Sequence, residues 1–70
     1  MSNVTITHLT EAQALARPSQ MLDYVITIRN KRGKFVKAIR YKGASGHSMW
    51  DYEKDWTNEY PKSEGYTVDW

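Results

Sequence analysis

The residue types that most often carry catalysis or hold metals are few in this sequence. It has two histidines, His8 and His47, and no cysteine. A zinc site needs three or four ligands, and no acidic residue stands at a ligand spacing beside either histidine. We therefore expect no metal site and no cofactor.

A serine beside a histidine and a series of carboxylates are the remaining candidates for catalysis. Ser48 follows His47 directly, but adjacent helical positions do not face each other, so we interpret Ser48 as a helix cap. Asp51, Asp55 and Glu59 recur on the polar side of a predicted helix. Carboxylates in acid–base catalysis need burial or a charged neighbour to shift their pKa. We expect no catalytic residues and no enzyme activity.

The charged residues are sorted along the chain, and this sorting is the clearest functional signal. Residues 24–50 hold seven lysines and arginines and no acid, whereas residues 51–70 hold six acids and two lysines, within a net charge of +2. Such segregation concerns partners more than the fold. Exposed ion pairs inside one chain stabilise it by only about 0–1 kcal/mol each, which is a weak reason for this distribution.

The basic segment is predicted to be a β-hairpin. Two runs rich in β-branched and aromatic residues flank residues 30–34, Asn-Lys-Arg-Gly-Lys, which is typical of a hairpin. Gly33 would supply the left-handed residue of a three-residue loop. That loop pairs Ile28 with Val36 and Ile26 with Ala38, on an apolar face that should meet the core.

The opposite face of this hairpin is predicted to be the functional one. We prefer this register because a slip by one residue would set Ile28 opposite Lys37 and mix the two faces. The functional face would then carry Arg29, Phe35, Lys37, Ile39 and Tyr41.

The remaining elements are predicted from capping and periodicity. A strand is expected at residues 3–8, and a short helix at about 11–16 begins at the capping box of Thr10 and Gln13. The main helix at about 48–60 should pack on the sheet through Met49, Tyr52, Trp56 and Tyr60, which share one face. A last strand is expected at residues 66–70.

These elements predict an α+β fold with one domain, residues 1–70. A small antiparallel sheet of three to four strands would surround the hairpin at about 22–42, in the order βαββαβ in minimal form. The chain lacks a long apolar run and a charged, apolar start, so we expect no membrane span, no signal peptide and a cytoplasmic location.

The first functional hypothesis is a protein-binding module that acts as an inhibitor or adaptor by occluding a partner surface. Nine aromatic residues exceed what so small a core needs, and interfaces favour Tyr, Trp and Arg as anchors. The partner would offer an acidic or phosphate-accepting groove. The expected contact residues are Arg29, Lys31, Arg32, Lys34, Phe35, Lys37, Arg40, Tyr41 and Lys42. In general character the chain is similar to the small single-domain proteins with which phages block host or defence machinery.

The alternative hypothesis is nucleic-acid binding by the same hairpin. Cations interleaved with aromatic side chains on a strand fit phosphate contact and base stacking in DNA or RNA. The acidic helix would repel phosphate unless it is held well away. A surface with both signs of charge suits a protein partner better than a polyanion, so we favour the first hypothesis.

Overall fold

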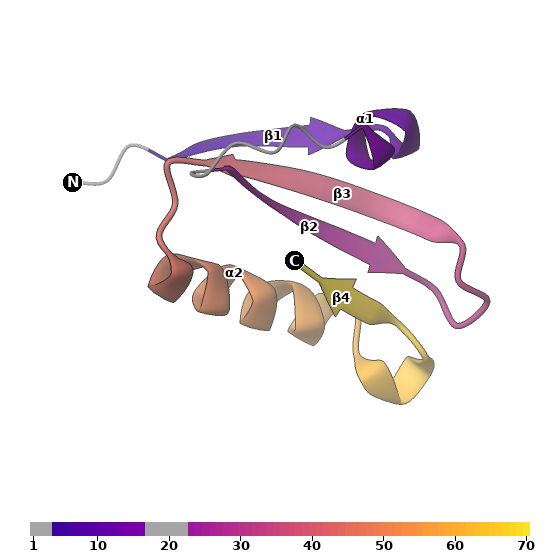
Figure 1. Ribbon diagram of the computed structural model, residues 1–70. Helices are drawn as coiled ribbons and strands as arrows, with labels where there is room; N and C mark the ends of the chain where they lie inside the picture. The colour runs from indigo at the N-terminus through magenta and orange to yellow at the C-terminus, as the bar shows by residue number, and fades with distance from the viewer. Residues whose placement is uncertain (1–3, 17–22) are drawn as a thin grey trace.

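The computed structural model of the protein describes residues 4–16 and 23–70. Figure 1 shows a twisted sheet with the longer helix on one side and the shorter helix on the other. The elements are β1 (Thr5–Leu9), α1 (Glu11–Leu15), β2 (Asp23–Arg29), β3 (Phe35–Lys42), α2 (Gly46–Glu59), the 3-10 helix η1 (Lys62–Glu64) and β4 (Thr67–Asp69). The predicted α+β class and the order βαββαβ are confirmed.

The sheet is antiparallel, with the strand order β1-β3-β2-β4. The final strand therefore joins this sheet, where it pairs with β2. Two connections, β1-α1-β2 and β3-α2-β4, each join parallel strands across one intervening strand. Both connections move in the same direction across the sheet. The strands β1 and β2, however, point in the opposite direction to β3 and β4. Right-handed crossovers then place the two helices on opposite faces, as Figure 1 shows.

The predicted hairpin register is correct only next to the turn. Arg29 pairs with Phe35 as expected, but Ile28 pairs with Lys37, because the register shifts between Ile28 and Arg29. Val36 is the additional residue of a β-bulge, which reverses the side-chain alternation along the rest of the strand. From Ile28 back to the start of β2, the two strands therefore pair in the register shifted by one residue, which we did not expect.

The bulge places the larger apolar residues on the side of the sheet that α2 covers, here called the α2 face. A buried cluster on this face contains Ile26, Ile28, Ile39, Tyr41, Ala44 and Met49. Val36 packs against the same cluster, although it would alternate away from Ile39 without the bulge. The opposite side, the α1 face, has a smaller cluster of Ala14, Val25 and Ala38, against which Leu9 and Phe35 pack.

The local signals at the helix ends are mostly confirmed. The Thr10 backbone donates to the Gln13 side chain at 2.9 Å, and the Gln13 backbone donates to the Thr10 hydroxyl at 3.2 Å. The main helix begins earlier than predicted, because Ser45 rather than Ser48 is its cap. The Ser45 hydroxyl accepts the Ser48 backbone N–H at 3.1 Å, so Gly46 and His47 become the first helical residues.

Candidate binding surfaces

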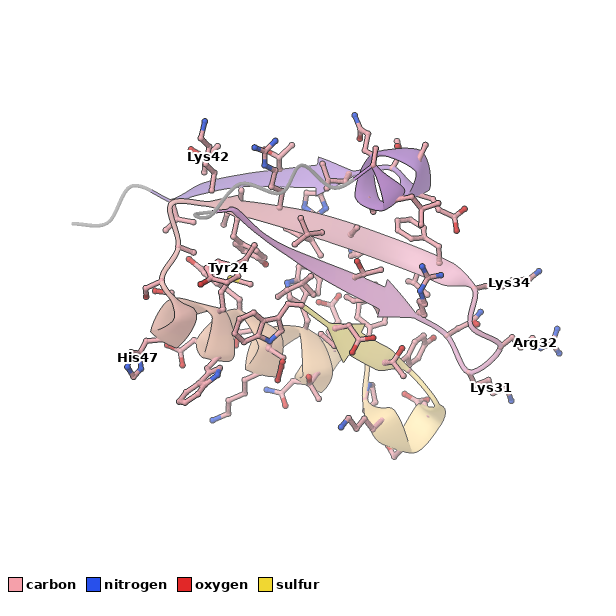
Figure 2. All side chains as sticks on the ribbon, in the orientation of Figure 1. Tyr24, Lys31, Arg32, Lys34, Lys42 and His47 are labelled. Carbon is pink, nitrogen blue, oxygen red and sulfur yellow. The ribbon has the colours of Figure 1, made fainter. Side chains whose placement is uncertain are left out.

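Three exposed cations stand at the end of the central hairpin. Lys31, Arg32 and Lys34, here called the basic tip, are all exposed. Figure 2 shows their side chains extending away from the body of the molecule, whereas Lys42 lies at the other end of β3. The structure therefore keeps these three predicted contact residues together and separates Lys42 from them.

Hydrogen bonds hold the backbone of the basic tip in one shape. The Asn30 side-chain oxygen accepts the backbone N–H groups of Arg32 at 2.9 Å and Lys34 at 3.0 Å. The Asn30 backbone donates to the Lys34 carbonyl, and its own carbonyl accepts from Gly33, both at 2.9 Å. Gly33 has a φ of 78°, as its predicted left-handed role requires. The cations thus project from a fixed turn.

The chain after α2 supports the tip from one side. Gly65 has a φ of 91°, and its α-carbon approaches Lys31 so closely that an added Cβ would clash with the Lys31 Cβ. Glu64 and Tyr66 line an open hollow together with the three cations of the basic tip. This contact joins η1 to a loop more than thirty positions earlier in the chain.

Four of the other predicted contact residues lie on the α1 face. Arg29 and Phe35 form a cross-strand pair, and Arg40 and Lys42 follow at the alternate positions of β3. The Arg29 guanidinium donates to the Gly33 carbonyl at 3.1 Å, so it also supports the turn. Phe35 packs against the smaller cluster rather than standing free, so it is a poorer anchor than predicted.

Lys37 and Tyr41 were predicted to be exposed beside Arg29, and this prediction is wrong. Both lie on the α2 face because of the bulge. Tyr41 is only 2% exposed, and its hydroxyl accepts the Trp56 indole N–H at 2.6 Å. The Lys37 ammonium lies 4.9 Å from the centre of the Trp56 ring and 5.8 Å from that of Tyr60. The nine predicted residues therefore do not form one continuous surface.

A groove that the sequence did not predict lies between β3 and α2. We call it the acidic–aromatic groove, and it is lined by Tyr41, Tyr52, Asp55, Trp56 and Glu59. The rings of Tyr41 and Tyr52 stack at 4.2 Å between centroids. The four helical residues share one flank of α2 because they are three or four positions apart. The mixed stripe of rings and acids was visible in the sequence, but the bulge decides that Tyr41 meets it.

The floor of this groove is an unfavourable place for a negative charge. Burial raises the pKa of the Tyr41 hydroxyl above its ordinary value of 10.0, and the nearby Tyr52 and Asp55 raise it further. The hydrogen bond from Trp56 opposes the rise. Burial penalises a charge of either sign at this depth, and the carboxylate of Asp55 adds a specific penalty for a negative one.

A second aromatic cluster lies on the other flank of α2. Tyr24 and Trp70 meet edge to face at 5.5 Å, and His47 meets Trp50 in the same way at 5.6 Å. The Trp70 indole donates to Glu53. Trp50 is 65% exposed and contributes little to the core.

Other classes of site are not seen among the described residues. Within residues 4–16 and 23–70, no group of three or more His, Cys, Asp or Glu side chains is placed to hold a metal ion. In the same part of the chain, neither helix is both long and apolar enough to cross a bilayer. No protein-family model matches the sequence, and no curated protein or solved structure is significantly similar to it.

Proposed function

We propose that this protein is a small non-enzymatic binding module that acts in the cytoplasm as an inhibitor or adaptor of a protein partner. The basic tip is its contact surface. It enters an acidic groove of the partner, or a groove that normally accepts phosphate, and blocks that groove. Arg29, Arg40 and Lys42 on the α1 face extend the contact where the partner is broad enough.

The observation that carries this proposal is the fixed turn beneath exposed cations. Binding costs less conformational entropy when the backbone of the contact surface is already ordered. Asn30 orders the turn through both its side chain and its backbone. Arg32 at its apex can make bidentate bonds to a carboxylate or a phosphate, which a lysine cannot.

The charge on the rest of the surface favours a protein partner over a polyanion. Asp55 and Glu59 line the groove on the α2 face, and Glu64 lines the hollow beside the tip itself. A protein can present charges of both signs to match these positions, and complementary charge gives specificity and a faster association rate.

The test is a pull-down from a host lysate with three tagged forms of the protein. The tip variant carries Arg32→Glu and Lys34→Glu, and the matched control carries Lys54→Glu and Lys62→Glu. Both pairs are exposed and change the net charge by the same amount. We expect the wild type and the control to capture the same protein, and the tip variant to bind it at least about tenfold more weakly. Equal capture by the tip variant would reject this contact surface.

Nucleic-acid binding by the hairpin is the second candidate, and one observation favours it. Arg40 and Lys42 lie on the α1 face, whereas the acidic helix α2 lies beneath the opposite face. The sheet thus separates the acids from a phosphate backbone that would lie on the α1 face. Titration with random duplex and single-stranded DNA and RNA at two salt concentrations distinguishes the candidates.

Phosphate contacts give a characteristic salt dependence. Three phosphate contacts would lower the affinity for a duplex about 40-fold between about 50 and about 200 mM salt. Micromolar binding with this dependence would support nucleic-acid recognition. No binding at the lower salt concentration would leave the protein partner as the function.

A further inference from the structure

The acidic–aromatic groove lies beside the exposed edge of the sheet. Glu53 on the opposite flank of α2 accepts a hydrogen bond from Trp70, which follows β4, so the groove opens on the side away from β4. Tyr41 in its floor is the ladder partner of Ile6 in β1. Paired residues share one face of a sheet, with Cβ atoms about 5 Å apart. The groove and the α2-facing side of β1 therefore form one surface.

The sequence of the strand β1 lacks the charges and the proline that often protect a sheet edge. Its sequence, Thr5 to Leu9, contains no proline, lysine, arginine or acid. Ile6 is 52% exposed, and β1 has five residues, whereas the opposite edge strand β4 has three. Proteins usually protect exposed edges with charges, proline or bulges. An unprotected edge of this length is suited to pairing with another extended chain.

The chemistry of the groove selects a cation. Asp55 and Glu59 place two carboxylates at its rim, and neither forms an ion pair with another residue that the structure describes. The ring of Trp56 already attracts the ammonium of Lys37 at 4.9 Å, the geometry of a cation–π contact. The space of about 210 Å³ is smaller than the roughly 300–1,000 Å³ of small-molecule pockets. One side chain suits it better than a metabolite.

We propose that β1 pairs with an extended segment of a partner protein, and that an arginine or lysine of this segment places its charged end in the acidic–aromatic groove. Neighbouring strands lie about 4.8 Å apart, so an added strand would lie about 10 Å from β3. Only a long side chain reaches from there beneath Ile6 toward the carboxylates of Asp55 and Glu59. This proposal does not depend on the basic tip, so it stands or falls separately from the proposed function.

The test is an NMR titration of the whole protein with short capped peptides. The probe alternates threonine and valine around one central arginine, and matched peptides carry glutamine or glutamate instead. We expect the arginine peptide to shift the backbone amide signals of Thr5–Leu9 and the indole N–H signal of Trp56. Its affinity should exceed that of the glutamine peptide about tenfold, since ion pairs with Asp55 and Glu59 are gained. A peptide with N-methylated backbone amides should not bind, because it cannot pair with a strand.

Variants show whether the groove provides the preference. Asp55→Asn with Glu59→Gln should bind the arginine and glutamine peptides equally. The control, Glu64→Gln with Asp69→Asn, removes the same charge at exposed positions outside the groove and should keep the preference. All four substitutions are on the surface, and circular dichroism checks that both variants are folded.

Several outcomes would overturn the proposal. They are equal affinity for all peptides, signal shifts confined to another surface, and an unchanged arginine preference in the Asp55→Asn, Glu59→Gln variant. Binding of the N-methylated peptide would exclude strand pairing. Dimerisation through β1 of the protein alone, seen as a doubled mass with amide protection at Thr5–Leu9, would assign this edge to a second copy instead.

Discussion

The basic tip and the acidic–aromatic groove are built in different ways. The basic tip uses five consecutive residues whose backbone is fixed by Asn30, with Gly65 packed against one side. The groove brings Tyr41 of β3 against residues that lie eleven to eighteen positions later on α2. Local hydrogen bonds therefore set the shape of the tip, whereas the register of the sheet and the packing of α2 set the shape of the groove. Changes in the core should damage the groove first.

Replacing Trp56 with alanine should have the largest effect and should act on the groove. The ring packs against the buried cluster on the α2 face, and its indole N–H donates to the Tyr41 hydroxyl. We expect the free energy of unfolding to fall by about 3 kcal/mol, the lower end for a large aromatic residue because the ring is only half-buried. Denaturant unfolding measures this loss.

Trp50→Ala is the matched control for that experiment. Trp50 lies on the same helix but is 65% exposed, so its removal should change the free energy of unfolding by less than about 0.5 kcal/mol. If the two variants lose the same stability, Trp56 is not the link between α2 and the sheet.

A pair of glycine substitutions tests the support of the basic tip. Gly65→Ala imposes a left-handed residue and a clash with Lys31, so we expect a loss of about 2–3 kcal/mol. Gly33→Ala imposes only the left-handed residue, because nothing lies within 4 Å of the added Cβ. Its loss should be about 1 kcal/mol. Equal losses in thermal or denaturant unfolding would show that η1 does not press on the tip.

Alkaline pH should weaken the groove more than the tip. The pKa of Tyr41 is raised in the folded protein, so the unfolded chain releases this proton first. The contribution of Tyr41 to the free energy of unfolding is therefore fully present below pH 10.0. It declines as the pH rises through the folded pKa, by at most about 1.4 kcal/mol per pH unit. Tyr41→Phe should reduce this decline. The same slope in both proteins would exclude Tyr41 as its source.

The smallest expected change comes from Asn30→Ala. It leaves the N–H groups of Arg32 and Lys34 without their acceptor, but water can replace it at this exposed turn. We expect a loss of about 1 kcal/mol, with faster hydrogen exchange at residues 31–34 and no change at Trp56. Faster exchange throughout the sheet would contradict a local role for Asn30.

The sequence was most informative where the structure depends on neighbouring residues. The capping box of Thr10 and Gln13, the left-handed Gly33 and the amphipathic stripe of α2 were all predicted, because each is a short-range pattern. The basic tip belongs to the same group, since consecutive residues form it.

The sequence was misleading where one backbone irregularity reassigns side chains to the other face. A strand without a bulge would direct Ala38 and Arg40 toward the core under α2. The observed bulge directs Ile39 and Tyr41 there instead. The signal was the uneven spacing of apolar residues 36, 39 and 41, which an unbroken strand cannot place on one face. A strand without a bulge places Tyr41 on the partner surface. The groove that Tyr41 forms with α2 is therefore not predicted.

The most direct test of the basic tip as the contact surface is hydrogen exchange of the free protein and of its complex with the captured partner. We predict new protection at residues 30–34, and unchanged exchange rates at the amides of α2. Any further protection should be limited to η1, which lies beside the tip. Protection confined to α2 or to β1, with the exchange of residues 30–34 unaltered, would contradict this assignment.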